Sequence, residues 1–118
     1  MQPNQATLPK DAVKLSESVT AMGEHWARPQ DMPVGPIYLV YKGKVIGIEF
    51  MVSQELMKNM TTPDEGTFLE LAGLPVNTYV DHMDIEFMPH GHPSYEVPHY
   101  DVHLYFISVA EQQAIGAS

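Results

Sequence analysis

Alternation of apolar and polar residues predicts four β-strands along this chain. The clearest pair is the run IYLVYKGKVIGIEFMV, in which two segments rich in β-forming residues flank Lys42 and Gly43 and therefore predict a hairpin. Two further strands are predicted in NTYVDHMDIEF and HYDVHLYFISV. The segment between them, MPHGHPSYEVP, contains three prolines and is predicted to be a loop.

Helical periodicity is restricted to shorter segments. From Asp11, apolar residues recur at helical spacing as far as a glycine that can end a helix, so an N-terminal helix of about three turns is predicted. The residues concerned are Ala12, Leu15, Val19, Met22 and the terminating Gly23. Ser53 can cap a helix of about two turns in SQELMKNM, and AEQQAIGAS predicts a short helix in the tail. These elements predict an α+β fold, built as a curved antiparallel sheet or a small open barrel with an N-terminal helix.

Length and composition limit the number of domains and the kinds of partner that the chain can have. With 118 residues, of which 44% are hydrophobic, the chain suits one globular domain, predicted over residues 11–118. Residues 1–10 are polar, contain two prolines and are predicted to form a flexible tail. The formal net charge of −9 repels phosphate backbones and anionic membranes, so neither nucleic acids nor membranes are expected as partners. The same charge attracts cations.

The chain has no cysteine, which excludes disulfides, iron–sulfur clusters and thiolate zinc sites. A metal site would have to use histidine, carboxylate, tyrosine or water. No apolar run reaches the ~20 residues needed to cross a bilayer, and the N-terminus carries no apolar signal region. A soluble protein is therefore expected, either cytoplasmic or the mature form of an exported protein.

The histidines gather in the second half of the chain, where five of the six lie between His82 and His103. Successive side chains of a strand point to opposite faces, so the last strand should divide into two rows. One row is His99, Asp101, His103 and Tyr105, and the other, the predicted core face, is Tyr100, Val102, Leu104 and Phe106. If this strand pairs with the preceding one, one register sets His82 opposite His103, Asp84 opposite Asp101 and Glu86 opposite His99.

Distance limits what the polar row can bind. On a regular strand His99 and His103 are about 13 Å apart at roughly 3.3 Å per residue. They could share one ion only if the strand were bulged or bent, or if His99 lay in irregular chain after Pro98. Asp101 lies between them and suits a carboxylate that orients an imidazole. The alternative is a polar, solvated sheet face.

Other residues extend the set of candidates. His25 stands beside the only tryptophan and is either a site residue or a histidine at a helix C-terminus. Glu49 interrupts an apolar run, so it is either a ligand or general base with a partner, or an exposed strand residue. His92 is a further candidate ligand, whereas His90 is expected at the surface. The eight methionines are scattered along the sequence and are interpreted mainly as core residues.

Five segments together resemble a small uncharacterised bacterial family of histidine-containing domains. They are MGEHW, GPIYLVYKGKVIGIEFM, DHMDIEF, HGHP and PHYDVHLYF, and the pattern GH…PHYDxHxY is their most specific part. The resemblance runs from Met22 to Ile107 and implies a compact β-rich domain that assembles into closed rings, with no established activity. The residues to which it points are His25, Glu49, His82, His92, His99, Asp101 and His103. The chain departs from the family pattern at Leu104, where phenylalanine is common, and near Ser94, where a glycine is common.

The leading hypothesis is a metal-binding domain with a His/carboxylate site on a sheet face. The ion would be a divalent transition metal (Zn, Cu, Ni, Fe or Mn), among which the sequence does not choose. The candidate metal ligands are His82, His99, His103, His25 and His92. Asp101, Glu49 and Tyr105 are the candidate catalytic residues if an open coordination position supports chemistry.

Two alternatives remain open. One is a metal-free enzyme or small-molecule binder that uses its His/Asp pairs for acid–base chemistry. The other is an oligomeric, stress-related structural module with histidines at subunit contacts, and a homo-oligomer is the expected assembly. The sequence contains no cysteine, no GxSxG segment and no glycine-rich phosphate loop, so no nucleophile motif identifies an enzyme class.

Overall fold

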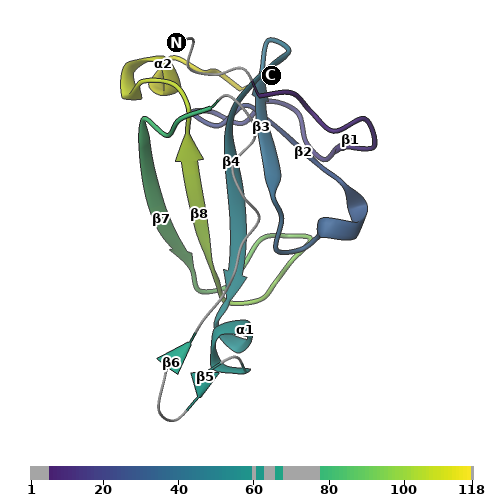
Figure 1. Cartoon of the computed structure of the whole chain (residues 1–118), viewed down its shortest axis with the longest axis vertical. Coiled ribbons are helices and arrows are strands. Elements are labelled where there is room, and N and C mark those ends of the chain that lie inside the picture. The colour runs from purple at the N-terminus through teal and green to yellow at the C-terminus, as the bar shows by residue number, and fades with distance from the viewer. Residues whose placement is uncertain (1–5, 60, 63–65, 68–77, 118) are drawn as a thin grey trace.

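A six-stranded antiparallel sheet forms the centre of the protein in this computed structural model, which describes residues 6–59, 61–62, 66–67 and 78–117 (Figure 1). The strand order is β1-β2-β3-β4-β8-β7. The strands are β1 (Val13–Lys14), β2 (Glu24–Ala27), β3 (Ile37–Tyr41), β4 (Lys44–Ser53), β7 (His82–Met88) and β8 (His99–Tyr105). A second sheet contains β5 (Thr61–Thr62) and β6 (Gly66–Thr67). Among the described residues β1 and β7 do not pair, so the large sheet is open, and the predicted antiparallel sheet is confirmed.

The predicted hairpin consists of β3 and β4. Its two-residue turn places Lys42 and Gly43 at φ values of 51° and 77°. Positive φ at both positions belongs to a turn whose twist matches that of the paired strands. Beyond the turn, β4 continues for 10 residues and pairs with β3 on one side and β8 on the other. The hairpin therefore supplies the central strand of the polar face.

Within the described residues, three short helical segments flank the sheet, namely η1 (Pro29–Asp31), α1 (Gln54–Asn59) and α2 (Val109–Gln113). Ser53 precedes α1 as predicted, and its Oγ accepts a hydrogen bond from Leu56 N at 2.9 Å. The predicted helix in the tail is α2, which begins with a capping box between Ser108 and Glu111. No helix in the described part of the chain is long and apolar enough to span a membrane.

The predicted N-terminal helix is wrong. Residues 11–23 instead form β1, turns and an antiparallel bridge between Val19 and Gly23, and Leu15 N donates to His25 O at 2.7 Å. Serine, threonine and β-branched residues in this segment lower its helix propensity. A short helix would also need an apolar face packed against the sheet. Leu15 and Val19 remain 46% and 40% exposed, so their helical spacing does not mark a buried face.

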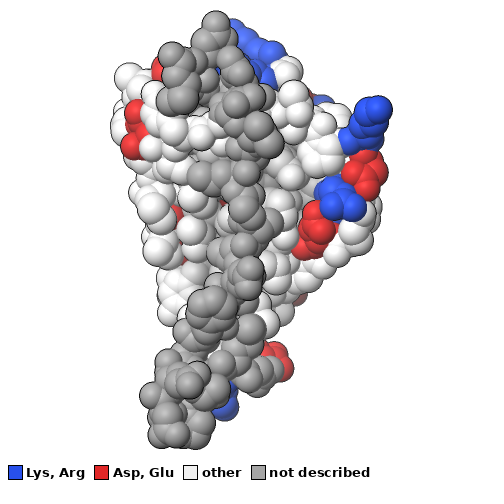
Figure 2. All heavy atoms as spheres, viewed as in Figure 1, with Lys and Arg blue, Asp and Glu red and all other residues white. Residues whose placement is uncertain are grey.

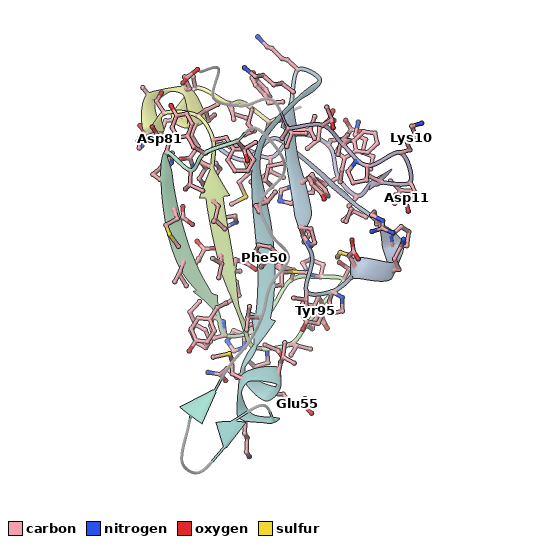
Figure 3. All side chains as sticks on the ribbon, in the orientation of Figure 1. Lys10, Asp11, Phe50, Glu55, Asp81 and Tyr95 are labelled. Carbon is pink, nitrogen blue, oxygen red and sulfur yellow. The ribbon has the colours of Figure 1, made fainter. Side chains whose placement is uncertain are left out.

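The polar row of β8 lies on the more deeply buried face of this strand. The four residues of that row are almost inaccessible to solvent: His99, Asp101, His103 and Tyr105. On the predicted core face Tyr100 is 36% exposed, and Leu104 packs against the hydrophobic cluster that contains Phe50, whose place in β4 is labelled in Figure 3. Alternation along a strand separates two faces but does not show which segments of chain cover them. The alternative of a polar, solvated sheet face is therefore wrong for β8, and within this strand the row predicted to form the core is the less buried of the two.

Strands β7 and β8 pair as predicted, but their register is shifted by two residues. The observed pairs are His82 with Tyr105, Asp84 with His103, and Glu86 with Asp101. A shift by two keeps every side chain on its predicted face, whereas a shift by one would reverse the faces. The long connection 89–98 does not fix the register as a two-residue turn would. The two polar rows therefore meet, but with different partners.

Charged side chains lie at the margins of the face shown in Figure 2, and near β1 and β2 both signs are interspersed. Arg28 forms ion pairs with Asp11 at 3.0 Å and with Asp31 at 3.8 Å. Exposed ion pairs of this kind add little to stability. None of these three residues lines the pocket described below.

Candidate functional site

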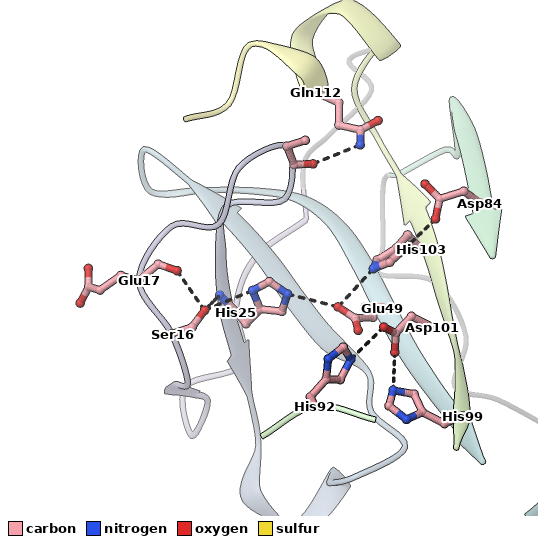
Figure 4. A network of polar contacts seen from close by, with 11 residues as sticks. Ser16, Glu17, His25, Glu49, Asp84, His92, His99, Asp101, His103 and Gln112 are labelled. Carbon is pink, nitrogen blue, oxygen red and sulfur yellow. Dashed lines mark hydrogen bonds and ion pairs between the residues drawn. The ribbon is translucent and has the colours of Figure 1, made fainter. Parts of the chain in front are cut away.

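A pocket of about 430 Å³ opens on the polar face of the sheet. Residues of β4 and β8 line it together with the N-terminal segment before β2 and the loop before β8. Its apolar lining consists of Leu15, Val19, Met22, Met32, Ile37, Met51 and Pro93. Histidines and carboxylates also line it, and all of these except Glu86 belong to the two clusters of polar contacts shown in Figure 4. A mostly apolar pocket with a few convergent polar groups is typical of a small-molecule site.

The first cluster contains His92, His99 and Asp101. His92 Nε2 lies 2.9 Å from Asp101 Oδ2, and His99 Nε2 lies 2.8 Å from Asp101 Oδ1. One ligand atom of each residue lies within 4.8 Å of those of the other two. Two atoms bonded to one ion at about 2.1 Å lie within about 4.2 Å of each other. Small side-chain rotations would therefore let all three residues reach a common metal ion.

Different elements position the members of this cluster. His99 and Asp101 belong to β8, whereas His92 belongs to the loop before it. The loop is closed by a reciprocal pair of backbone hydrogen bonds between His92 and Tyr95, at 2.9 and 2.8 Å. Gly91 makes this turn at a φ of 71°, which favours glycine. The His92 and His99 rings lie in contact, with their centroids 4.8 Å apart.

The contact between His99 and Asp101 is short but is not a hydrogen bond. His99 Nε2 and Asp101 Oδ1 are both buried, and neither has an aligned hydrogen-bond partner among the described residues. His99 Nδ1 lies 2.7 Å from the Val97 carbonyl oxygen, which can only accept, so Nδ1 carries a proton. In the neutral ring, Nε2 is then an acceptor that faces the carboxylate, a second acceptor. The pair requires either a further proton, on the ring or on the carboxyl group, or a bound cation.

Two carboxylates are buried on this face, with Asp101 3% exposed and Glu49 4% exposed. Burial raises the pKa of Asp101, and the charge of Glu49 raises it further, whereas contacts with His92 and His99 act in the opposite direction. Desolvation and repulsion between like charges both disfavour the ionised carboxylate. A cation bound at the first cluster would favour the ionised form of Asp101.

Glu49 is the centre of the second cluster. Its Oε1 lies 3.2 Å from His25 Nε2 and 3.4 Å from His103 Nε2. His103 Nδ1 donates to Asp84 Oδ1 at 2.7 Å, and His25 Nδ1 lies 3.2 Å from Ser16 Oγ. A row of polar side chains therefore runs from the N-terminal segment through β2, β4 and β8 to β7 (Figure 4).

The two ring contacts keep Glu49 ionised. Burial acts to raise the pKa of Glu49, but contacts with His103 and His25 outweigh burial and lower this pKa to about 2. Burial acts to lower the pKa of His103, but Glu49 and Asp84 outweigh it and raise the pKa to about 9. At neutral pH an ionised Glu49 therefore lies beside a protonated His103. This is the kind of partner that a buried carboxylate requires.

The structure does not bring together the histidines that were expected to share one ion. His99 lies in the first cluster, His103 lies in the second, and His82 lies in neither. His82 Nδ1 is 2.9 Å from Asp81 Oδ2, and its Nε2 is 2.6 Å from Gln112 Oε1 in α2. Burial acts to lower the pKa of His82, but these two contacts outweigh it and raise the pKa. A site built from His82, His99 and His103 is therefore not formed.

Tyr105, a candidate catalytic residue, lies beside these clusters rather than on the pocket wall. Its ring stacks on His82 with centroids 5.0 Å apart. Burial raises the pKa of Tyr105, and nearby carboxylates raise it further, so its hydroxyl stays protonated. Tyr105 is not among the described residues that line the pocket.

Sequence reasoning missed Ser16 and Gln112. Ser16 falls within the predicted helix, and no motif connects it with His25. The antiparallel pairing of β1 with β2 brings these residues together. The turn signal at Gly23, which has a φ of 85°, could have indicated a hairpin-like reversal here instead of a helix end. Gln112 links distant parts of the chain, because its Nε2 donates to Ala21 O at 3.1 Å.

Comparisons with known proteins place the fold. The chain is similar to the crystal structure of hypothetical protein TTHB210 from Thermus thermophilus, with a TM-score of 0.62 and 21% sequence identity. The match covers 87% of this chain and 93% of that one. No protein-family model matches the chain, and no curated protein matches it. At this identity the similarity establishes a common fold, so the function has to be argued from the site itself.

Proposed function

We propose that this protein binds a divalent transition metal ion through His92, His99 and Asp101. The observation that carries the proposal is the buried contact of 2.8 Å between His99 Nε2 and Asp101 Oδ1, two atoms without an aligned hydrogen-bond partner among the described residues. A proton on Nε2 would not point at the carboxylate oxygen. A metal ion accepts both atoms as ligands and removes the conflict between two facing acceptors.

The surroundings of His99 support this assignment. Its Nδ1–H donates to the Val97 carbonyl, which leaves Nε2 as the unprotonated nitrogen that ligation requires. Metal-bound histidines typically donate their second ring N–H to a carbonyl or a carboxylate in this way. The His92 side chain is 35% exposed, so an ion could enter the cluster from the pocket.

Three protein ligands leave coordination positions for water or for a molecule in the pocket. Two imidazoles and one carboxylate are the protein ligands of many catalytic zinc sites and of a large class of non-haem Fe(II) sites. We therefore expect Zn²⁺ or Fe²⁺ ahead of Cu²⁺, Ni²⁺ or Mn²⁺. A metal-bound water at such a position is a nucleophile near neutral pH.

Removal of a ligand should abolish metal binding. We expect one equivalent of metal in wild-type protein reconstituted with Zn²⁺ or Fe²⁺, and a loss of affinity of at least about 100-fold in His99→Gln and Asp101→Asn. Elemental mass spectrometry after gel filtration would measure both. His90→Gln is the matched control, because His90 is exposed in the loop that also carries His92, and it should keep its metal. Full metal content in both ligand variants, or no binding of any of the five ions by folded wild-type protein, would contradict the proposal.

The position of the His92 loop should also control affinity. A Cβ at Gly91 would lie 2.5 Å from Val97 N and 2.8 Å from Glu96 Cα, so Gly91→Ala must displace the backbone of the loop. We expect metal affinity to fall by about 10–100-fold, as it does when groups that position a ligand are changed. Gly43→Ala is the control, since Gly43 also has a positive φ but nothing lies within 4 Å of a Cβ added there. Calorimetric titration with Zn²⁺ would compare them, and equal affinities would show that the loop does not position His92.

A further inference from the structure

Three pocket residues outside the proposed metal site form a chain of contacts with a defined order. Ser16 Oγ lies 3.2 Å from His25 Nδ1, and His25 Nε2 lies 3.2 Å from Glu49 Oε1. All three residues line the pocket. A hydroxyl next to an imidazole that has a carboxylate on its other side is the order of groups by which proteins activate a serine, although Glu49 Oε1 and His25 Nε2 are in close contact without an aligned hydrogen bond.

We propose that Ser16, His25 and Glu49 form a nucleophilic site that hydrolyses small uncharged esters without a metal ion. In this site Ser16 is the nucleophile and His25 is the general base. Glu49 is a positioning residue, which holds the imidazole and stabilises its protonated form. This activity goes beyond metal binding, because it uses none of the three proposed metal ligands.

The Ser16 hydroxyl is placed to transfer its proton. Its oxygen is 3.0 Å from Glu17 O and 3.2 Å from His25 Nδ1, so rotation about the Cβ–Oγ bond can direct the hydrogen to either acceptor. The backbone N–H of His25 donates to the same oxygen at 3.3 Å and restrains its position. Nucleophile and base lie at about 2.6–3.2 Å in active sites and often somewhat farther apart before substrate binds.

The rest of the second cluster keeps the carboxylate ready for this role. His103 lies on the other side of Glu49, at 3.4 Å, and is itself held by Asp84 at 2.7 Å. Glu49 therefore lies between two imidazoles, and the His25 ring lies between this carboxylate and the Ser16 hydroxyl. An anion at this point favours the imidazolium that forms when Ser16 attacks.

The pocket favours a neutral and largely apolar substrate. Its described lining includes the carboxylates of Glu49, Glu86 and Asp101 and no lysine or arginine, so it disfavours anions. Leu15 directly precedes Ser16 and Val19 lies three residues after it; both line the pocket and are 46% and 40% exposed, which offers apolar contacts to a substrate. A volume of about 430 Å³ accommodates an ester with a short acyl chain.

The reaction has two balanced steps. In the first, Ser16 Oγ bonds to the ester carbonyl carbon, its proton moves to His25 Nδ1, and the carbon–oxygen bond to the alcohol breaks as His25 returns the proton to the departing alcohol. In the second, water bonds to the acyl carbon and gives a proton to His25. The bond to Ser16 Oγ then breaks, the serine recovers that proton, and the carboxylic acid is released.

Turnover and covalent labelling would test the proposal on the full chain in EDTA. We expect wild-type protein to hydrolyse p-nitrophenyl butyrate and to react once with a fluorophosphonate, with the label on Ser16 in peptide mass spectra. Ser16→Ala and His25→Gln should lower kcat at least about 100-fold and prevent labelling. Glu49→Gln should lower kcat with little change in KM, and thermal unfolding would confirm that it is folded. Ser18→Ala is the matched control, since Ser18 lies two residues further along the same segment and is not among the described residues that line the pocket, and it should keep full activity.

A second experiment tests directly whether His25 activates a nucleophile at position 16. Because the chain has no cysteine, Ser16→Cys and Ser94→Cys each introduce a single thiol. At pH 7 we expect the thiol introduced by Ser16→Cys to react with iodoacetamide at least about 10-fold faster than the thiol introduced by Ser94→Cys. The reason is that the neighbouring His25 favours the thiolate. Combining His25→Gln with Ser16→Cys should lower the alkylation rate to that of the Ser94→Cys thiol.

Several results would overturn this proposal and leave the metal site standing. These are full turnover in Ser16→Ala, a label on another residue, equal alkylation of the two introduced thiols, and turnover that requires added Zn²⁺ or Fe²⁺. In contrast, a protein that binds no metal but carries the label on Ser16 would contradict the proposed function and support the serine site.

Discussion

Glu49→Gln is expected to lower the free energy of unfolding by about 3 kcal/mol at pH 7. Glu49 is 4% exposed, and its pKa of about 2 in the folded protein lies well below the ordinary value of 4.5. Each unit of difference between the folded and unfolded pKa corresponds to about 1.4 kcal/mol of stability. The amide keeps the shape of the side chain but loses the attraction to the protonated His103. Urea denaturation of the protein in EDTA would measure the change.

The pH dependence of this effect has a definite sign. Because folding lowers the pKa of Glu49, its stabilisation is fully present above pH 4.5 and is lost as the pH falls towards 2. The difference in stability between wild type and Glu49→Gln should therefore shrink over that range. Glu86→Gln is the control, since Glu86 is exposed on β7, and it should change stability by less than about 0.5 kcal/mol. Equal losses of stability in the two variants would show that the contacts of Glu49 with the two imidazoles do not stabilise the fold.

Gly47→Val should destabilise the fold by about 3 kcal/mol and lower the melting temperature by roughly 10 °C. Gly47 lies in β4 between Leu39 of β3 and Tyr105 of β8. A Cβ at this position would lie 2.7 Å from the Leu104 carbonyl oxygen and 3.2 Å from the Tyr105 ring. The carbonyl belongs to the backbone of the neighbouring strand, so it cannot move without disturbing the β4–β8 pairing.

Gly116→Val is the matched control for this substitution, because nothing lies within 4 Å of a Cβ at Gly116. Its melting temperature, followed by circular dichroism, should stay within about 2 °C of wild type. If Gly47→Val melts at the wild-type temperature, β4 and β8 do not approach each other as closely at Gly47 as described.

The strands could be predicted because alternation is a local property of the sequence. The hairpin at Lys42 and Gly43 and the strands β7 and β8 follow from such patterns. The N-terminal segment could not be predicted in this way, because Leu15 and Val19 have helical spacing while the partner of the segment is β2. Spacing along a segment carries no information about which backbone lies next to it.

The sequence could predict which types of residue form the site, but it could not predict which of them lie together. The sequence indicated that the polar row of β8 and the lone Glu49 belong to a site, since each puts a polar group where an apolar one is expected. The division into two clusters depends on the register of β7 against β8 and on the fold of the loop that carries His92. Ser16 could not have been found, because its contact with His25 exists only after β1 and β2 pair.

The hydrogen bonds of Gln112 have a practical consequence for expression of the protein. This side chain in α2 joins Ala21 O, which lies just before β2, to the imidazole of His82 at the start of β7. Close by, Ala21 N donates to the carbonyl of Ile115, a residue that is 2% exposed. The last residues of the chain thus hold the segment that carries Ser16 in place. Affinity tags and fusion partners should therefore be attached through a long linker at this end, and versions shortened before residue 112 should not be used to assess the pocket.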